Sequence, residues 1–359
     1  MNYALETSHL SVDRRGVPVL GDLSLTVDSG ELVAVLGPSG AGKTTLLRAI
    51  CGLQRCRGTV LIDGRDVSEL PPHRRNCAIM LDDDGLFSHL TVRDNIAYAV
   101  NASRGDVTVS DQVEAALLTV NIDHLAGRLP HQMSMGERQR VALARILVRR
   151  PRVLLFDEPL AHVDATARAC LCQELVRVHR RMDCATIYVT HDVGEALSIA
   201  DRVVCLADGQ IVQDDYPEDV HATPARLDIA RHMGATTMIS CTARITGQPP
   251  MAEARIFDDV VRVAAHPRFD DLVGTEQQMV LVGYPGSIRI SRSSEQIRVH
   301  GRHGQVVSHV FDGEFYLVGV ETEYGMVTAR IGVDAEPMMV GDAVTVSAVA
   351  SRLWALPVG

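Results

Sequence analysis

The stretch "GPSGAGKT", residues 37 to 44, combines glycines, a lysine and a threonine at a spacing suited to phosphate binding. It follows the apolar run "ELVAVL" and precedes a segment with helical spacing, the context that G-x-x-x-x-G-K-[ST] requires. Glycines let backbone N–H groups turn toward phosphate oxygens, and a helix start behind them adds positive potential. We expect Lys43 to reach the β- and γ-phosphates of a nucleoside triphosphate, and the Thr44 hydroxyl to bind Mg²⁺. The predicted phosphate-binding residues are Gly37, Pro38, Ser39, Gly40, Ala41, Gly42, Lys43, Thr44 and Thr45.

Two carboxylates end a second apolar run, "VLLFDEP". Asp157 is expected to hold the water shell of the metal, and Glu158 to polarise an attacking water. His191 follows "TIYVT" in the same way, at the strand end where ligands bind in open α/β sheets, and can sense a γ-phosphate. The predicted catalytic residues are therefore Lys43, Glu158 and His191.

These residues need a parallel sheet to bring them together. "ELVAVL", "RVLLF" and "TIYVT" are typical of buried strands, whereas "KTTLLRAICGL" and "ERQRVALARILVRR" have the apolar spacing of helices. Their alternation over residues 1–233 predicts an α/β domain with a largely parallel sheet. Beyond "ARHMG", short alternating strands broken by Gly and Asp predict an all-β domain over residues 234–359.

The bulk composition narrows the functional classes. A length of 359 residues suggests two domains, and 46% hydrophobic with 22% charged residues is typical of globular proteins. The net charge of −10 argues against a general nucleic-acid partner. The opening "MNYALETSHL" lacks the pattern of a signal peptide, and no apolar run approaches the ~20 residues of a membrane helix. The eight cysteines contain no CxxC pair, which favours reduced thiols in the cytosol.

The order of motifs resembles that of the ATPase subunits of ABC transporters, specifically of binding-protein-dependent importers. The phosphate loop is followed by "LFSHLTVRDNIAYAV", "MSMGERQRVALARIL", "VLLFDEPLAHVDA" and "IYVTHDVGEALSIADRV", so that the resemblance covers residues 1 to about 233. It implies an α/β fold of the P-loop NTPase class, an ABC cassette with a helical subdomain at about residues 83–150. The all-β part resembles the accessory domain of importer ATPases, a small OB-like barrel at residues 234–359.

The resemblance also implies partners and cofactors. Two ATPase subunits, alike or unlike, would close head to tail around two ATP molecules with Mg²⁺, and would drive two membrane-spanning permease subunits. An external solute-binding protein would deliver a sugar, a polyamine or an inorganic ion such as ferric iron. The signature residues Ser134, Gly136 and Glu137 would complete the partner's nucleotide site, and Asp164 would lie at the contact between subunits. The complex would place this chain at the cytoplasmic face of the cell membrane.

The signature departs from the family's Leu-Ser-Gly-Gly-Gln and reads "MSMGE". Ser134 and Gly136 are retained, and S-x-x-E predicts a capping box between Ser134 and Glu137. Met135 places a long side chain where glycine allows close approach, and Glu137 adds negative charge near a triphosphate. At about 6 to 7 Å and an effective dielectric of about 20, this repulsion is roughly 2 to 3 kcal/mol. We expect a weakened but working signature, with Arg138 as a partial offset.

Other positions depart as well. Asp82 takes the place of a glutamine that touches the metal and the water, which gives the predicted metal set Thr44, Asp157 and Asp82. Asp82 could bind Mg²⁺ through oxygen, repel the γ-phosphate or be solvated. No aromatic residue is available for adenine, and Arg14 or Arg15 could either stack on the base or be solvated.

A milder change places Ala161 and His162 where the family favours small polar residues. Glu158 and His191, which act on this subunit's own nucleotide, are present. The departures from the family pattern therefore lie mostly on the surface that would complete the partner's nucleotide site. Pairing with an unlike ATPase is therefore allowed. The alternative to a working ATPase is a nucleotide-binding regulatory or structural subunit with weak hydrolysis.

Overall fold

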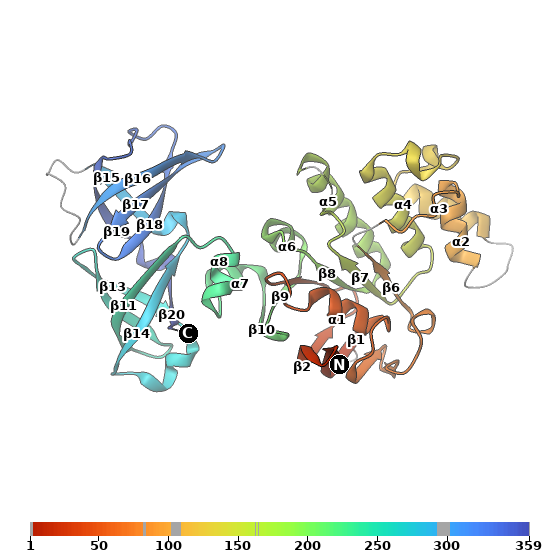
Figure 1. The fold of residues 1–359 in the computed structure, drawn as a ribbon, viewed down its shortest axis with the longest axis horizontal. Helices are drawn as coiled ribbons and strands as arrows, with labels where there is room; N and C mark the ends of the chain where they lie inside the picture. The colour runs from red at the N-terminus through yellow and green to blue at the C-terminus, as the bar shows by residue number, and fades with distance from the viewer. Residues whose placement is uncertain are drawn as a thin grey trace. The chain divides into compact units, whose positions relative to one another are not determined.

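The computed structural model describes residues 3–81, 84–101, 109–161, 163, 165–292 and 302–358. The chain divides into two compact units, Met1–Pro217 and Glu218–Gly359, and both are seen in Figure 1. The division falls earlier than the domain boundary predicted near residue 234, for a reason found in the contacts of the second unit.

A six-stranded sheet organises the first unit, in the order β10-β9-β3-β8-β7-β6 among the residues described. The strands are β3 (Leu32–Leu36), β6 (Cys77–Met80), β7 (Val153–Asp157), β8 (Ala185–Val189), β9 (Arg202–Ala207) and β10 (Gln210–Asp215). Neighbouring strands from β9 to β6 run parallel, and β10 pairs antiparallel with β9. Every residue of β3, β7 and β8 is buried, as their continuous apolar runs predict for a sheet covered on both faces.

An antiparallel sheet covers one side of this core, in the order β2-β1-β4-β5. Its strands are β1 (Leu5–Arg14), β2 (Val17–Val27), β4 (Arg57–Ile62) and β5 (Arg65–Asp66). Helix α1 (Lys43–Ile50) packs between the two sheets, because its buried face joins one apolar cluster with residues of β1, β2, β3, β7 and β8. The predicted helix after the phosphate loop begins at Lys43, within the last two residues of the motif.

A second apolar cluster joins a group of helices with residues of the large sheet. These are α2 (Val92–Asn101), α3 (Val109–Thr119), α4 (Met135–Leu147), α5 (Ala165–Met182) and α6 (Val193–Ile199), with short 3-10 turns at Pro72–Arg74, Asp123–Leu125 and Pro130–Gln132. Figure 1 shows α2, α3 and α4 gathered beyond the edge strand β6, within the segment predicted as a helical subdomain. No helix in the described ranges is long and apolar enough to cross a membrane.

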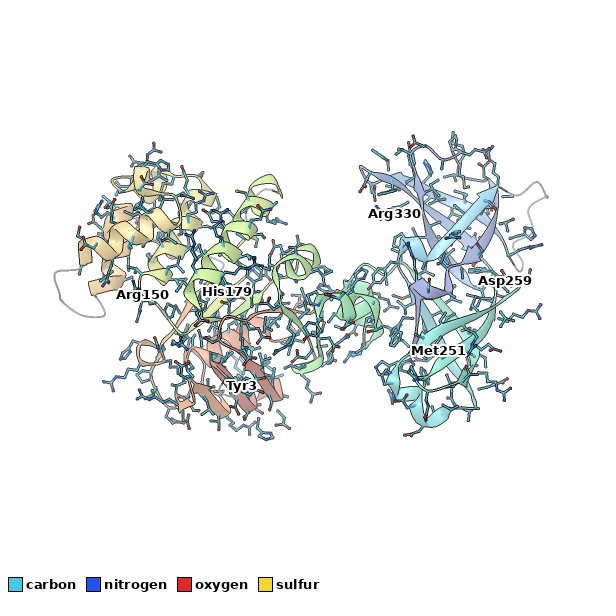
Figure 2. All side chains as sticks on the ribbon, turned by 180° about the vertical axis from the view of Figure 1, so that it is seen from behind. Tyr3, Arg150, His179, Met251, Asp259 and Arg330 are labelled. Atoms are coloured by element: carbon cyan, nitrogen blue, oxygen red, sulfur yellow. The ribbon has the colours of Figure 1, made fainter. Side chains whose placement is uncertain are left out.

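Helix α5 is fixed to the sheet by a buried histidine, His179, which Figure 2 labels. Its Nδ1 lies 2.9 Å from the hydroxyl of Thr186 on β8, and its Nε2 lies 3.1 Å from the carbonyl oxygen of Gly30. Burial lowers the pKa of His179, so the neutral ring is favoured.

The second unit begins with two short helices, α7 (Pro217–Ala222) and α8 (Leu227–His232), and is otherwise built of strands. In its described residues, a closed barrel has the order β11-β12-β13-β20-β14, and a five-stranded sheet has the order β15-β19-β16-β17-β18. The barrel strands are β11 (Thr237–Thr246), β12 (Met251–Ile256), β13 (Asp259–Ala265), β14 (Glu276–Gly283) and β20 (Leu353–Pro357). The sheet strands are β15 (Ile288–Arg292), β16 (His303–Phe311), β17 (Phe315–Thr322), β18 (Gly325–Gly332) and β19 (Ala343–Ala348). The predicted all-β character of this region is confirmed.

Contacts of α7 and α8 explain why the units divide after Pro217. The Tyr284 hydroxyl donates to the carbonyl oxygen of His221 at 2.7 Å, and the two rings stack with centroids 4.0 Å apart. The Trp354 indole N–H donates to the carbonyl oxygen of Pro224 at 3.1 Å. One apolar cluster joins Ala230, Ala235, Val280, Val282 and Leu356. The two helices therefore pack on the barrel, although they precede the change in sequence texture.

Candidate functional site

The predicted phosphate loop connects β3 to α1 and uses its glycines for different reasons. Gly40 and Gly42 have φ angles of 83° and 103°, in the left-handed region that favours glycine. A Cβ at Gly37 would overlap the carbonyl oxygen of Leu206, and one at Gly42 would lie 2.6 Å from Cδ2 of Leu20. A Cβ at Gly40 would meet nothing within 4 Å, so this side of the loop is open.

Lys43 lies over the same loop. Its Nζ donates to the carbonyl oxygens of Gly37 at 2.7 Å and Pro38 at 3.1 Å. Burial lowers the pKa of Lys43, whereas the nearby carboxylates of Glu158 and Asp157 act in the opposite direction. The ammonium group is therefore held at the loop, where the motif predicts that it meets phosphate oxygens.

Thr44 and Asp157 are brought together from positions 113 residues apart. The Thr44 hydroxyl donates to Oδ1 of Asp157 at 3.0 Å, at the carboxyl end of β7. A hydroxyl and a carboxylate are hard oxygen ligands, which is the donor set that Mg²⁺ prefers. These two members of the predicted metal set therefore fit the ion, whereas Asp82 lies outside the described residues.

Glu158 and His191 follow two neighbouring strands and face each other. Nδ1 of His191 lies 3.0 Å from Oε2 of Glu158, and the two side chains are 61% and 34% exposed. Glu158 adopts a left-handed backbone with φ of 49°, and its N–H donates to the carbonyl oxygen of Val189 at 2.9 Å. The parallel pairing of β7 with β8 thus places a carboxylate and an imidazole side by side at a solvent-accessible edge.

The signature residues form the predicted capping box at the start of α4. The N–H of Glu137 donates to the Ser134 hydroxyl at 3.3 Å, and the N–H of Ser134 donates to Oε2 of Glu137 at 2.7 Å. Hydrogen bonds from the backbone and hydroxyl of Ser134 lower the pKa of Glu137, so its carboxylate is charged at neutral pH. Gly136 has open surroundings among the described residues, since the contact that a Cβ there would make is with Cδ1 of Leu171, at an ordinary 3.8 Å.

Arg138 makes its ion pair with Asp84 rather than with the carboxylate of Glu137, and the partial offset expected from sequence stays a prediction. Its Nε donates to Oδ2 of Asp84 at 2.8 Å, and the guanidinium also contacts the carbonyl oxygen of Met133 and the sulfur of Met135. The guanidinium turns toward Asp84, 54 residues earlier in the chain, because this carboxylate is about three-quarters buried and lies within reach. The Glu137 charge therefore lacks this direct partner.

Several predicted positions remain untested by the geometry. Asp164 and His162 lie outside the described residues. Arg14 and Arg15 are exposed at the turn between β1 and β2, where Arg15 has a φ of 54°. Stacking on adenine and solvation therefore both stay open for these two arginines.

Sequence reasoning missed a buried arginine that supports the phosphate-loop helix. Arg75 is 4% exposed, and its guanidinium donates to the carbonyl oxygens of Ala49 at 3.0 Å and Ile50 at 2.9 Å, at the end of α1. Further bonds reach the carbonyl oxygens of Leu70 and Ser68. A cation that satisfies the last carbonyls of a helix also complements its dipole. Nothing in the run "PPHRRNC" distinguishes Arg75 from exposed Arg74.

Comparison with known proteins places these features in a family. Residues 20–161 match the ABC transporter family. The spermidine/putrescine import ATP-binding protein PotA of Vibrio vulnificus is 34% identical over 324 residues, which cover 90% of this chain and 85% of PotA. This chain belongs to the ATP-binding subunits of ABC importers. A Salmonella typhimurium protein named as the 2-aminoethylphosphonate import ATP-binding protein PhnT is 40% identical over 257 residues, 70% of each chain.

Solved structures agree with the assignment of an ABC cassette. The cbiO1 protein of Clostridium perfringens, part of the ABC transporter complex cbiONQ, is similar with a TM-score of 0.57 at 27% identity, covering 64% of this chain and 94% of cbiO1. A dimeric ATP-binding cassette bound to ADP and phosphate in a post-hydrolysis state has a TM-score of 0.54 at 25% identity, covering 59% of this chain and 98% of that one. The predictions of an ABC cassette and of an importer ATPase are confirmed.

Proposed function

We propose that this importer ATPase binds ATP and Mg²⁺ at the loop of residues 37–44 and hydrolyses ATP beside Glu158 and His191. Backbone N–H groups of the loop and Lys43 bind the phosphates, and Thr44 with Asp157 holds the metal. When bound, Mg²⁺ neutralises charge that develops on the phosphates. The observation that carries the proposal is the pairing of Glu158 with His191 at 3.0 Å, beside the Thr44–Asp157 bond at 3.0 Å.

Glu158 and His191 have separate roles in this proposal. The Glu158 carboxylate orients and polarises the water that attacks the γ-phosphate. His191 hydrogen-bonds Glu158 through Nδ1 and contacts the γ-phosphate through the rest of its ring, so it senses whether that phosphate is present. Both side chains are partly exposed, so a water molecule and a nucleotide can reach them.

A second ATPase subunit completes each nucleotide site. Ser134, Gly136 and Glu137 contact the nucleotide on the partner, and Asp164 lies at the subunit contact. The open surroundings of Gly136 support this role, because the chain's own packing does not require glycine there. The similar cassette of known structure is described as dimeric.

The pair of ATPase subunits energises two membrane-spanning permeases from the cytoplasmic face of the membrane, with an external solute-binding protein. PotA is named for spermidine and putrescine and PhnT for 2-aminoethylphosphonate, and these solutes share an amino group. We therefore propose a small organic amine as the solute. The test of an amine as the solute measures ATP hydrolysis by the complex reconstituted in vesicles. Amine-loaded binding protein should stimulate hydrolysis more than sugar-loaded binding protein does.

The decisive experiment is steady-state ATP hydrolysis by the full chain with Mg²⁺, beside the variant Glu158→Gln. Glutamine keeps the size and the contact with His191 but cannot act as a carboxylate, so we expect turnover to fall at least about 100-fold. The control is Glu276→Gln, which removes the same charge from an exposed position on β14. Unchanged turnover in Glu158→Gln would reject the proposed site.

A second candidate, a regulatory subunit paired with an unlike ATPase, is favoured by Met135 and by the charged Glu137. It predicts that the chain alone binds ATP without turnover, and that Met135→Gly with Glu137→Gln restores hydrolysis. Turnover by the unaltered chain alone, abolished in Glu158→Gln, would exclude it.

A further inference from the structure

A buried carboxylate lies directly behind the turn that carries His191. Glu195, in the first turn of α6, is 8% exposed. Its Oε2 accepts hydrogen bonds from the hydroxyls of Tyr188 at 3.0 Å and Thr190 at 2.9 Å. Thr190 in turn accepts from the N–H of Asp192 at 3.0 Å. The residues on both sides of His191 are therefore held by one polar network.

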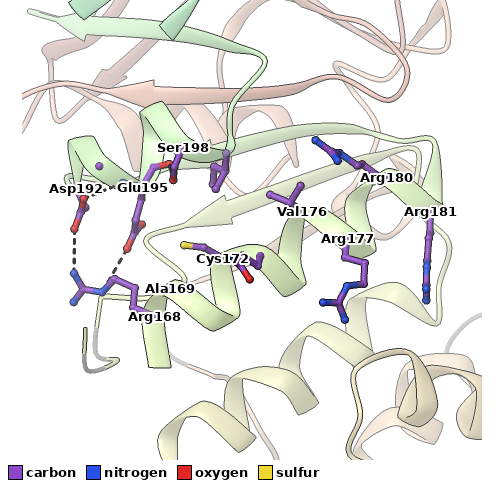
Figure 3. Close-up of a pocket in the computed structure, with 13 residues that line it drawn as sticks. Arg168, Ala169, Cys172, Val176, Arg177, Arg180, Arg181, Asp192, Glu195 and Ser198 are labelled. Atoms are coloured by element: carbon purple, nitrogen blue, oxygen red, sulfur yellow. Dashed lines mark hydrogen bonds and ion pairs between the residues drawn. The ribbon is translucent and has the colours of Figure 1, made fainter. Parts of the chain in front are cut away.

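Arg168, near the start of α5, pairs with Asp192 and Glu195 of this network (Figure 3) and also reaches a different loop. Its Nη1 donates to Oδ2 of Asp192 at 3.1 Å, and its Nε lies 3.5 Å from Oε1 of Glu195. Its Nη2 donates to the carbonyl oxygen of Val163 at 3.0 Å. Val163 is buried and lies on the loop that begins with Glu158 at the end of β7.

The two loops that Arg168 connects are those that present Glu158 and His191. The arginine contacts Asp192, the residue after His191, and Val163, five positions after Glu158. A planar guanidinium presents its donors in a fixed geometry, which a lysine ammonium on a flexible stem does not. Here Nη1 and Nη2 are hydrogen-bonded, whereas buried Nε makes only the ion pair with Glu195. Its charge also compensates the buried carboxylate of Glu195, which is otherwise costly to bury.

We propose that Arg168 is a positioning residue that holds the His191 turn against the Glu158 loop and so sets the contact between those two side chains. This inference rests on the proposed roles of Glu158 and His191. Among the described residues, the hydrogen bonds and ion pairs of Arg168 reach neither the phosphate loop nor the Thr44–Asp157 pair, so the proposed effect on hydrolysis comes from the placement of His191 beside Glu158.

The test is a double-mutant cycle on ATP hydrolysis by the full chain, measured as kcat and KM with radiolabelled ATP so that slow turnover is quantified. We expect Arg168→Gln to lower kcat about 10- to 100-fold with KM for ATP changed less than about twofold, because misplacement of a reacting group affects the chemical step. Arg168→Lys, which keeps the charge, should retain an intermediate kcat. Arg177→Gln, an exposed arginine on the same helix, is the matched control and should leave both constants unchanged.

The combination with His191→Ala decides the mechanism. If Arg168 acts through His191, Arg168→Gln has little further effect on kcat in the His191→Ala background. Equal losses in both backgrounds would show an independent or merely structural role and overturn the inference, as would an unchanged kcat in Arg168→Gln. Should Arg168→Gln fail to fold, Arg168→Lys and Asp192→Asn are judged by the same criterion. An unchanged kcat in His191→Ala alone would instead refute the proposed role of His191.

Discussion

Replacing Glu137 by glutamine should strengthen the ATP-driven pairing of two subunits. The carboxylate is charged, because hydrogen bonds from Ser134 lower its pKa, and Arg138 is occupied by Asp84. At about 6.5 Å from a partner's γ-phosphate, an effective dielectric of about 20 gives a repulsion of roughly 2.5 kcal/mol. Physiological salt, with a Debye length of about 8 Å, reduces this to about 1 kcal/mol.

The substitution also has a cost within the subunit. Oε2 of Glu137 accepts from the N–H of Ser134 at 2.7 Å, and a neutral amide oxygen makes a weaker bond than a carboxylate. We expect the capping box to lose about 0.5 to 1 kcal/mol, which lowers the stability of α4 and leaves its packed face intact. The variant should therefore be slightly less stable as a monomer. A dimer of identical subunits contains two such contacts, so the substitution removes about 2 kcal/mol of repulsion and the subunits should pair about 30-fold more tightly.

Analytical ultracentrifugation with Mg²⁺ and ATP measures this effect, in the Glu158→Gln background where ATP persists. The dimer dissociation constant is compared with and without Glu137→Gln at low and high salt, and Glu276→Gln serves as the charge control. The gain should shrink as salt rises, because screening weakens the repulsion. An unchanged or weaker dimer, or a gain independent of salt, would refute the electrostatic argument.

Three other outcomes are expected. Arg75→Met should lower the free energy of unfolding by about 3 to 5 kcal/mol in denaturant titrations, because several buried carbonyls lose a charged donor, whereas exposed Arg74→Met should change it little. Burial lowers the pKa of His179, so below about pH 6.5 the unfolded chain binds a proton at this residue more readily than the folded chain does. The free energy of unfolding should therefore fall by up to about 1.4 kcal/mol per pH unit as the pH is lowered. His179→Gln should remove this part of the dependence of the unfolding free energy on pH. Burial raises the pKa of Cys172 to about 12, so iodoacetamide at pH 8 should label exposed Cys170 well before Cys172, as read by mass spectrometry of peptides.

The features that sequence reasoning predicted are those encoded within a few residues. The motif around Lys43 lies between a strand and a helix as expected, and the run before Asp157 is a fully buried strand. The capping box of Ser134 and Glu137 is also local, since both partners lie within one helical turn. Parallel strands then bring Thr44 to Asp157 and Glu158 to His191 at one edge of the sheet. Predicting the parallel sheet was therefore enough to predict that these residues lie close together.

The features that were missed depend on contacts between distant segments. The partner of Arg138 is Asp84, and the acceptors of Arg75 include the end of α1, neither of which a local pattern reveals. Arg168 reads as one more charge on an amphipathic helix, although it bridges two loops. The boundary after Pro217 was missed for the same reason, because α7 and α8 have ordinary helical sequences and only their packing assigns them to the barrel.

The pair between Asp84 and Arg138 has a mechanical consequence. It ties the segment after β6 to the residue beside the signature at 2.8 Å, with both side chains about three-quarters buried. A displacement of Asp84 must either pull the start of α4 with it or break a charge-assisted bond that contributes about 1.5 to 3 kcal/mol. Asp84 and the start of α4 are therefore mechanically coupled. A movement of Asp84 displaces Arg138 as well, unless it supplies enough free energy to break their ion pair.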